Sequence, residues 1–305
     1  MKALGIILAG GNSSRMQSLT DKRAIAAMPV GGAYRSIDFV LSNMTNSHIQ
    51  TVAVLSQYNA RSLNEHLNSA KWWNFGRKQG GLFLFTPTVT TENSWWYRGT
   101  ADAIWQNIDF LKKRHEPYVI IASGDGIYKL DFNKVLDYHI EKQADITVVC
   151  ANLPYQDDIS RYGVVQMDAD GRITEYEEKP MVTSSNTVSA GVYVIRRRVL
   201  IELLEECNRE GRYNLVTDIL IRYKNLKKIY GYRMEGYWAN IADVDSYFRA
   251  NMDFLRRDVR DYFFHEDPGI YSKTHDLPPA KYNVGSRVTN SLVAGGCIIN
   301  STVEN

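Results

Sequence analysis

The chain begins with an apolar run that ends at a pair of glycines. Leu4–Leu8 and Ala9 are followed by Gly10 and Gly11, then by small polar residues and Arg15. The run lacks polar and apolar alternation, which is typical of a strand buried on both faces of a sheet. Glycines let the backbone pass close to a ligand, and loop N–H groups and an arginine supply positive potential. The segment therefore predicts a buried strand and a phosphate-handling loop. Because its spacing matches neither common phosphate-loop fingerprint, an ordinary tight turn is the alternative.

Three further runs rich in Val and Ile predict strands at Thr51–Ser56, Tyr118–Ala122 and Ile146–Ala151. Each is separated from its neighbours by a segment long enough for a crossover helix. Short apolar strands that alternate with helices indicate a parallel α/β sheet.

Two of the intervening segments repeat apolar residues at helical spacing. One helix is predicted over residues 37–44, and a second over residues 104–111 with Thr100 as its candidate N-cap. We expect both helices to bury their apolar faces against the sheet.

The pattern changes beyond residue 150. A hairpin is predicted from Tyr162–Met167 and Arg172–Tyr176, which flank a turn containing two aspartates and a glycine. A strand at Val188–Ile195 follows, and then a helix through Leu200–Cys207 that stops at Gly211. The second half of the sheet is therefore expected to be mixed.

The last residues form a different pattern. Over residues 288–303, aliphatic side chains recur at roughly six-residue intervals with Ser, Asn and Gly between them, as at the start of a hexapeptide β-helix. One coil cannot bury its own face, and such solenoids need about three or more repeats. We therefore expect the sequence to be part of a longer chain, the alternative being a single loose strand.

Composition limits the classes of partner. A net charge of +2 over 305 residues gives no electrostatic reason to expect a nucleic acid. The three cysteines, Cys150, Cys207 and Cys297, are odd in number and far apart, which argues against a disulfide framework. No apolar run approaches the roughly 18 residues of a membrane span, and no signal peptide is expected. We expect a cytoplasmic protein with neither a nucleic-acid nor a membrane partner.

A series of motifs occurs in the order found in one enzyme family. They are Leu8-Ala-Gly-Gly11 with Arg15, Asp21-Lys-Arg-Ala24, Gly31-Gly32 with Tyr34-Arg35, Ile37-Asp-Phe39, Leu41-Ser-Asn43, Gln57-Tyr58, Trp96-Tyr-Arg-Gly-Thr-Ala-Asp-Ala103, Gly124-Asp125, Ile127-Tyr-Lys129, Glu178-Lys-Pro180 and Leu277-Pro-Pro-Ala-Lys281. The chain resembles the ADP-glucose pyrophosphorylases, also called glucose-1-phosphate adenylyltransferases. The matches span nearly the whole chain, and the block that begins at Trp96 is the most specific.

The resemblance implies an α/β, Rossmann-like nucleotidyltransferase fold with a mixed, mostly parallel sheet and the start of a C-terminal left-handed β-helix. It divides the chain into a catalytic-type domain (1–250), a linker (251–284) and the first coil of the β-helix (285–305). The implied reaction, in glycogen biosynthesis, is attack of glucose-1-phosphate on the α-phosphorus of ATP, giving ADP-glucose and pyrophosphate with Mg²⁺ as cofactor. The implied assembly is a homo- or hetero-tetramer, the latter with a catalytic homologue.

Site residues are carried over by the same resemblance. Arg15 and Asp125 are the expected catalytic residues, and Asp125 and Asn240 the expected metal ligands. Asp125 also follows a predicted strand at the edge where α/β sheets bind ligands, although an aspartate between two glycines is often only a turn former. The expected nucleotide-binding residues are Leu8, Ala9, Gly10, Gly11, Tyr97, Gly99, Thr100 and Ala101. The expected sugar-phosphate residues are Glu178, Lys179 and Ser189.

The chain departs from the family pattern at several positions. Asn240 stands where the second metal ligand is an aspartate, and Ile25 and Ala33 stand where the family has lysines. Smaller departures are Ser13, Ser14, Ala26, Gly126 and Ala239. An amide oxygen brings no charge to Mg²⁺, and Asp243, three residues further on, is a poor substitute by its offset. At roughly 2–4 kcal/mol per lost preorganised contact, these changes should remove most activity.

Two hypotheses follow from these departures. The chain is either an adenylyltransferase with weakened catalysis or an inactive regulatory subunit that assembles with an active homologue. A relative that uses another nucleoside triphosphate is disfavoured by the block at Trp96. If the chain turns over, Asn240→Asp combined with Ile25→Lys is expected to raise the rate.

Overall fold

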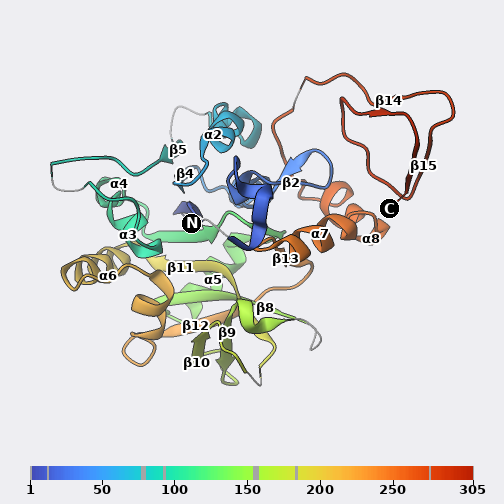
Figure 1. Ribbon diagram of the computed structural model, residues 1–305. Coiled ribbons are helices and arrows are strands. Elements are labelled where there is room, and N and C mark those ends of the chain that lie inside the picture. The colour runs from blue at the N-terminus through green and yellow to red at the C-terminus, as the bar shows by residue number, and fades with distance from the viewer. Residues whose placement is uncertain are drawn as a thin grey trace.

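The structure, a computed structural model, describes residues 2–11, 14–76, 80–91, 94–153, 158–182, 185–274 and 276–304. Within these residues a nine-stranded sheet forms the centre of the molecule (Figure 1). Its strands are β1 (Ala3–Ala9), β4 (Thr51–Ser56), β5 (Gly81–Phe85), β6 (Tyr118–Ser123), β8 (Ile146–Asn152), β9 (Gly163–Met167), β10 (Ile173–Glu178), β11 (Thr187–Arg196) and β12 (Ile229–Arg233).

The first half of the sheet is parallel and the second half is mixed. β1 lies between β4 and β6 and is parallel to both, and β5 adds a parallel strand beside β4. β11 then runs antiparallel between β6 and β8, and the hairpin of β9 and β10 pairs with the beginning of β11. These pairings confirm the predicted strands, hairpin and mixed sheet. β5 and β12 were not predicted from the sequence.

Helices cover both faces of the sheet. Apolar residues of α3 (Thr100–Trp105), α4 (Ile108–Lys112) and α6 (Arg197–Arg209) form one buried layer with it. Those of α1 (Ser36–Asn46), α2 (Arg61–Leu67) and α5 (Phe132–Glu141) form the other. A third apolar cluster joins residues 16–39 to α7 (Val244–Asp253) and α8 (Arg257–Arg260).

One helix prediction needs correction. The apolar spacing predicted a continuous helix over residues 104–111, but the chain breaks at Gln106 and Asn107 into α3 and α4. Thr100 was also expected to be the N-cap. Gly99 occupies that position, and Thr100 is the first residue of the helix.

The shorter elements are 3-10 and π segments and two-stranded pairs. The 3-10 segments are Ser14–Thr20, Ile25–Ala27, Ala70–Trp73 and Ile159–Arg161, and the π segments are Val216–Ile221 and Asp261–His265. The paired strands are β2 (Pro29–Val30) with β3 (Tyr34–Arg35), and β7 (Gly126–Tyr128) with β13 (Trp238–Asn240).

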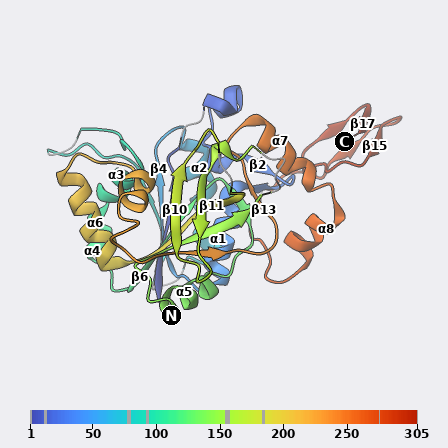
Figure 2. The ribbon, with the colours of Figure 1, turned by 90° about the horizontal axis from the view of Figure 1, so that it is seen from below.

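The C-terminal segment extends away from the sheet, beyond α7 in Figure 2. β14 (Lys281–Tyr282) pairs in parallel with β16 (Ile298–Ile299), and β15 (Arg287–Thr289) with β17 (Thr302–Glu304). These short pairs do not by themselves establish the β-helix expected from the sequence. In the described part of the chain, no helix has the length and apolar character needed to cross a membrane.

Candidate active site

The first part of the candidate site is a cavity at the carboxyl ends of β1 and β4. Its volume is about 410 Å³. Six of the eight residues expected to bind a nucleotide line it, and they come from the loop after β1 and from the segment that enters α3: Leu8, Gly10, Gly11, Tyr97, Gly99 and Thr100. The other two, Ala9 and Ala101, are buried behind it. The structure therefore brings together segments that lie nearly 90 residues apart.

Gln57 holds the two walls of this nucleotide-side cavity together. Its side-chain amide donates a hydrogen bond to the Tyr97 carbonyl (3.4 Å) and accepts one from the Tyr97 N–H (2.6 Å). The Tyr97 hydroxyl in turn accepts a hydrogen bond from Asn107 (3.0 Å). Gln57 directly follows β4, so its position after a buried parallel strand was the signal that could have marked it as a site residue.

The beginning of α3 packs against a distant segment of backbone. A Cβ on Gly99 would lie 2.3 Å from the Tyr213 carbonyl oxygen, so only glycine fits there. That oxygen accepts a hydrogen bond from the Ala101 N–H (2.8 Å). The Thr100 hydroxyl accepts one from the Leu215 N–H (2.9 Å), which explains why it does not cap its own helix.

The charged groups of the same motif are paired with each other. Arg98 lies over the Tyr213 ring, 3.9 Å from its centre, and its Nη2 is 2.9 Å from Oδ1 of the buried Asp102. Gln106 donates a further hydrogen bond to Asp102 (2.8 Å). These contacts fix the shape of the cavity wall and leave the Asp102 carboxylate engaged within the protein.

The second part of the site surrounds Asp125, at the carboxyl end of β6. The Ser123 hydroxyl donates a hydrogen bond to Asp125 Oδ1 (2.5 Å), and the Gly124 N–H donates one to the Leu8 carbonyl (3.0 Å). The Asp125 carbonyl accepts a hydrogen bond from the Ile241 N–H (3.1 Å). Asp125 is thereby tied to the nucleotide-side loop on one side and to the strand of Asn240 on the other.

The two expected metal ligands are neighbours in space. β13 runs antiparallel to β7, and this register places Asn240 opposite Gly126, the residue after Asp125. The backbone segments that carry Asp125 and Asn240 therefore lie side by side, and a carboxylate and an amide oxygen are donors that Mg²⁺ accepts together with water and phosphate oxygens. Among the described residues, no three His, Cys, Asp or Glu side chains gather as a possible metal site.

Asp243 is engaged elsewhere. Its carboxylate caps α7 by accepting a hydrogen bond from the Ser246 N–H (2.8 Å), and it forms an ion pair with Arg161. Burial alone would raise the pKa of the Asp243 carboxyl, but the Ser246 hydrogen bonds and Arg161 lower it overall. This arrangement agrees with the expectation that Asp243 does not replace the aspartate missing at position 240.

The expected sugar-phosphate residues meet at the beginning of β9. Glu178 ends β10 and pairs with Gly163, the first residue of β9. Ser189 directly follows the residue of β11 that pairs with β9. Lys179 is exposed, with Nζ 3.6 Å from Glu178 Oε1. Burial raises the pKa of Glu178, an effect that Lys179 opposes. The Ser189 hydroxyl is buried and donates a hydrogen bond to the Tyr193 hydroxyl (3.3 Å).

Arg15 and Ile25 lie outside the nucleotide-side cavity. Arg15 is exposed in the 3-10 segment Ser14–Thr20 and does not line the nucleotide-side cavity. Ser13 lies outside the described residues. Ile25, one of the positions where the family pattern has lysine, is only 9% exposed and packs in the apolar cluster of Phe39 and Ile241. A lysine there would bury its ammonium group among apolar side chains.

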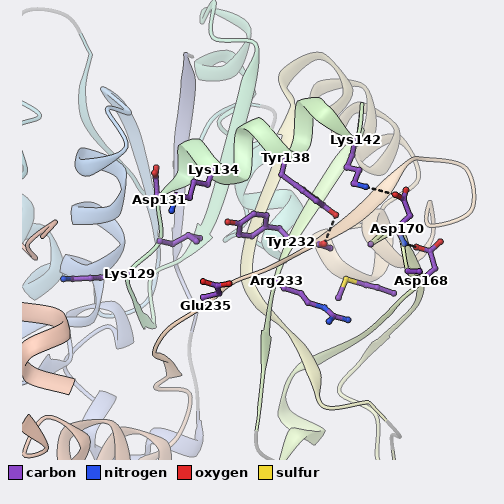
Figure 3. Close-up of a pocket in the computed structure, with 15 residues that line it drawn as sticks. Lys129, Asp131, Lys134, Tyr138, Lys142, Asp168, Asp170, Tyr232, Arg233 and Glu235 are labelled. Carbon is purple, nitrogen blue, oxygen red and sulfur yellow. Dashed lines mark hydrogen bonds and ion pairs between the residues drawn. The ribbon is translucent and has the colours of Figure 1, made fainter. Parts of the chain in front are cut away.

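A further cavity lies away from these residues. It has a volume of about 780 Å³ and lies between α5, the turn of the β9–β10 hairpin and β12 (Figure 3). Lys142 in its wall is paired with Asp170 (2.6 Å), and the Tyr138 hydroxyl donates a hydrogen bond to the Gly231 carbonyl (3.1 Å). None of the expected catalytic, nucleotide-binding, sugar-phosphate or metal-binding residues lines it.

A sheet whose glycine loop and acidic residue meet at the carboxyl edge is the architecture of a nucleotide-dependent transferase, and a family profile for nucleotidyl transferases matches residues 4–257. Three bacterial relatives named glucose-1-phosphate adenylyltransferase cover 99% of the chain. They are from Clostridium botulinum strain Alaska E43 (40% identical, 79% of the relative covered), Bacillus cereus strain Q1 (39%, 81% covered) and Thermosipho melanesiensis (37%, 74% covered). The chain belongs to the glucose-1-phosphate adenylyltransferase family.

Proposed function

We propose that this chain transfers the adenylyl group of ATP to glucose-1-phosphate and releases pyrophosphate, with catalysis weakened relative to a site with two metal carboxylates. The observation that carries the proposal is the meeting of Asp125 and Asn240 next to the Leu8 carbonyl, and thus next to the nucleotide-side cavity. This neighbourhood supports a cation site beside the phosphates of a nucleotide bound in that cavity.

The chain's own residues have distinct roles in this reaction. The backbone of Gly10 and Gly11, with Arg15, binds the triphosphate, and residues 97–101 enclose the nucleoside. The Lys179 ammonium pairs with the phosphate of the sugar, and Glu178 and Ser189 bind its hydroxyl groups. With both substrates held in line, a phosphate oxygen of glucose-1-phosphate attacks the α-phosphorus, and pyrophosphate leaves without a covalent enzyme intermediate.

Asp125 and Asn240 are the residues that would hold Mg²⁺. When bound, the cation neutralises the charge that develops on the transferred phosphate. The donor set fits this ion, which commonly uses one or two carboxylates together with substrate phosphates and water. Because the amide of Asn240 carries no charge, the cation is held more weakly than by two carboxylates.

The proposal includes a domain organisation and an assembly. Residues 1–250 form the catalytic-type domain, 251–284 the linker and 285–305 the first coil of a left-handed β-helix. The parallel pairing of β14 with β16 and of β15 with β17 supports the coil, because neighbouring coils of a β-helix pair in parallel. We expect a tetramer in the cytoplasm, a compartment that suits the free thiols of Cys150 and Cys207.

A second candidate function is that of a regulatory subunit. It is favoured by the burial of Ile25, since the position that holds lysine in the family pattern is here part of the apolar core. In this case the chain binds one or both substrates, turns over negligibly and alters the response of an active homologue.

Pyrophosphate release separates the two candidates. The chain is assayed with ATP, glucose-1-phosphate and Mg²⁺, alone and after mixing with an active homologue. Turnover by the chain alone, abolished in Asp125→Ala, supports the enzyme. No turnover alone, together with a changed rate or activator response in the mixture, supports the regulatory subunit. No turnover and no effect on the homologue would overturn both.

A further inference from the structure

Arg161 joins two parts of the site that are distant in sequence. It ends the 3-10 segment Ile159–Arg161, and its side chain is only 19% exposed. Its Nε is 2.9 Å from Asp158 Oδ2, and its Nη1 binds Asp243 Oδ2. Hydrogen bonds from Ser160 and Arg161 lower the pKa of Asp158 to about 2. The guanidinium is therefore held between two carboxylates.

The ion pair with Asp243 anchors Arg161 to the metal side of the site. Asp243 is 12% exposed on its side chain, caps α7 and follows Asn240 by three residues. Partly buried, charge-assisted contacts of this kind hold geometry better than exposed ion pairs. Arg161 and Asn240 also line the same cavity of about 330 Å³.

The residue after Arg161 connects to the sugar side. The Tyr162 carbonyl accepts a hydrogen bond from the Lys179 N–H (3.0 Å), and the Tyr162 ring packs edge-on against Trp238, 5.3 Å away. Lys179 has a positive φ of 52°, which is unusual for a residue other than glycine. Such a conformation persists only where the surroundings determine it, and the Tyr162 carbonyl is one such contact.

We infer that Arg161 is a positioning residue, which fixes the sugar-phosphate lysine Lys179 relative to Asn240 through its ion pair with Asp243. The inference rests on the proposed function, because it assigns Lys179 to the phosphate of the sugar. Arg161 acts through the backbone in this account. It holds the backbone that carries Tyr162, and Tyr162 holds Lys179.

Kinetics of four single variants, and of the double variant Arg161→Gln/Asp243→Asn, test this. Arg161→Gln and Asp243→Asn each break the ion pair, and asparagine keeps the cap of α7. Arg161→Lys restores a charge, and Arg222→Gln, which breaks an exposed ion pair with Glu210, is the matched control. We expect Arg161→Gln and Asp243→Asn each to raise the KM for glucose-1-phosphate about tenfold, with the KM for ATP changed less than twofold. Arg161→Lys should recover part of the loss, and the double variant should be no worse than either single one.

The inference is overturned if Arg161→Gln leaves the KM for glucose-1-phosphate unchanged or raises both KM values equally. Hydrogen exchange at the Lys179 amide distinguishes failure of this inference from failure of the proposed function, because the exchange rate can be measured without turnover. Faster exchange in Arg161→Gln and Asp243→Asn, but not in Arg222→Gln, supports the positional link even in an inactive chain. Unchanged exchange contradicts the link, whatever the chain's activity.

Discussion

The nucleotide side and the metal and sugar side of the candidate site are built differently. Around the nucleotide-side cavity, Gln57, Gly99 and Thr100 are fixed by backbone hydrogen bonds or close contacts, and Asp102 is paired with Arg98. On the other side, Lys179 is exposed and Asn240 brings no charge. The first region is enclosed by contacts within the protein, while the second has an exposed lysine and an uncharged amide as its substrate and metal groups. We therefore expect binding of ATP to be better retained than catalysis.

The largest expected effect is a loss of stability from a substitution in the apolar cluster next to the metal side. Ile25→Lys should destabilise the protein by about 3–5 kcal/mol, because it buries an ammonium group in the cluster of Phe39 and Ile241. The expected gain in rate from Asn240→Asp combined with Ile25→Lys stays a prediction, and this loss of stability would oppose it. Urea unfolding measures the loss, and Ile25→Met, which keeps the volume, should cost less than about 1.5 kcal/mol. A lysine variant as stable as its parent would show that this cluster opens to solvent.

On the nucleotide side, Gly99→Ala should cost about 3 kcal/mol in the free energy of unfolding and weaken ATP binding. The added Cβ would collide with the Tyr213 carbonyl, a backbone atom that cannot turn aside. Gly11→Ala is the control for stability, because among the described residues no atom beyond its chain neighbours lies within 4 Å of its added Cβ. Equal unfolding midpoints for the two variants would contradict the rigid wall described above.

Mild acid should weaken both regions together, because they share one sheet. Burial is the main cause that lowers the pKa of His139, a residue of α5 hydrogen-bonded to Thr147 of β8, to about 4. The folded pKa is below the unfolded value of about 6.5, so stability is full above pH 6.5 and falls as the pH drops toward 4. We expect a loss of about 2 kcal/mol between pH 7.5 and 5 from this group. His139→Gln should show a smaller loss, and an identical pH profile in both proteins would rule out this origin.

The smallest effect should be confined to the metal side. Asn240→Asp alone is expected to raise the rate of pyrophosphate release about tenfold, with the KM for ATP little changed. Asn225→Asp, in an exposed turn, adds the same charge elsewhere and should have no effect. If both variants behave alike, Asn240 is not a metal ligand and the contrast between the two sides loses its basis.

Four of the buried strands could be predicted because a strand covered on both faces consists of consecutive apolar residues. The runs at β1, β4, β6 and β8 are apolar on both faces, and the structure contains all four. β5 is short and only half-buried, and β12 carries a glycine and two tyrosines, so neither gives a clear strand pattern. The break between α3 and α4 was missed since the apolar spacing continues across Gln106 and Asn107.

The site was predictable in its parts but not in its connections. The resemblance selected Asp125, Asn240 and Lys179, and the structure shows which segments carry them together. The Arg161–Asp243 ion pair joins residues 82 positions apart, and no periodicity or local motif encodes such a contact. The burial of Ile25 was likewise not visible, because its short 3-10 segment has no amphipathic repeat.

The contact between Thr100 and Leu215 also sets an order of events during synthesis. The two residues are 115 positions apart, and Tyr213, two residues before Leu215, supplies the carbonyl against which Gly99 packs. The glycine loop at residues 8–11 therefore leaves the ribosome long before these two contacts can form. Until Tyr213 and Leu215 have emerged, the segment that enters α3 lacks their support, so the cavity wall that it forms can be completed only late in synthesis.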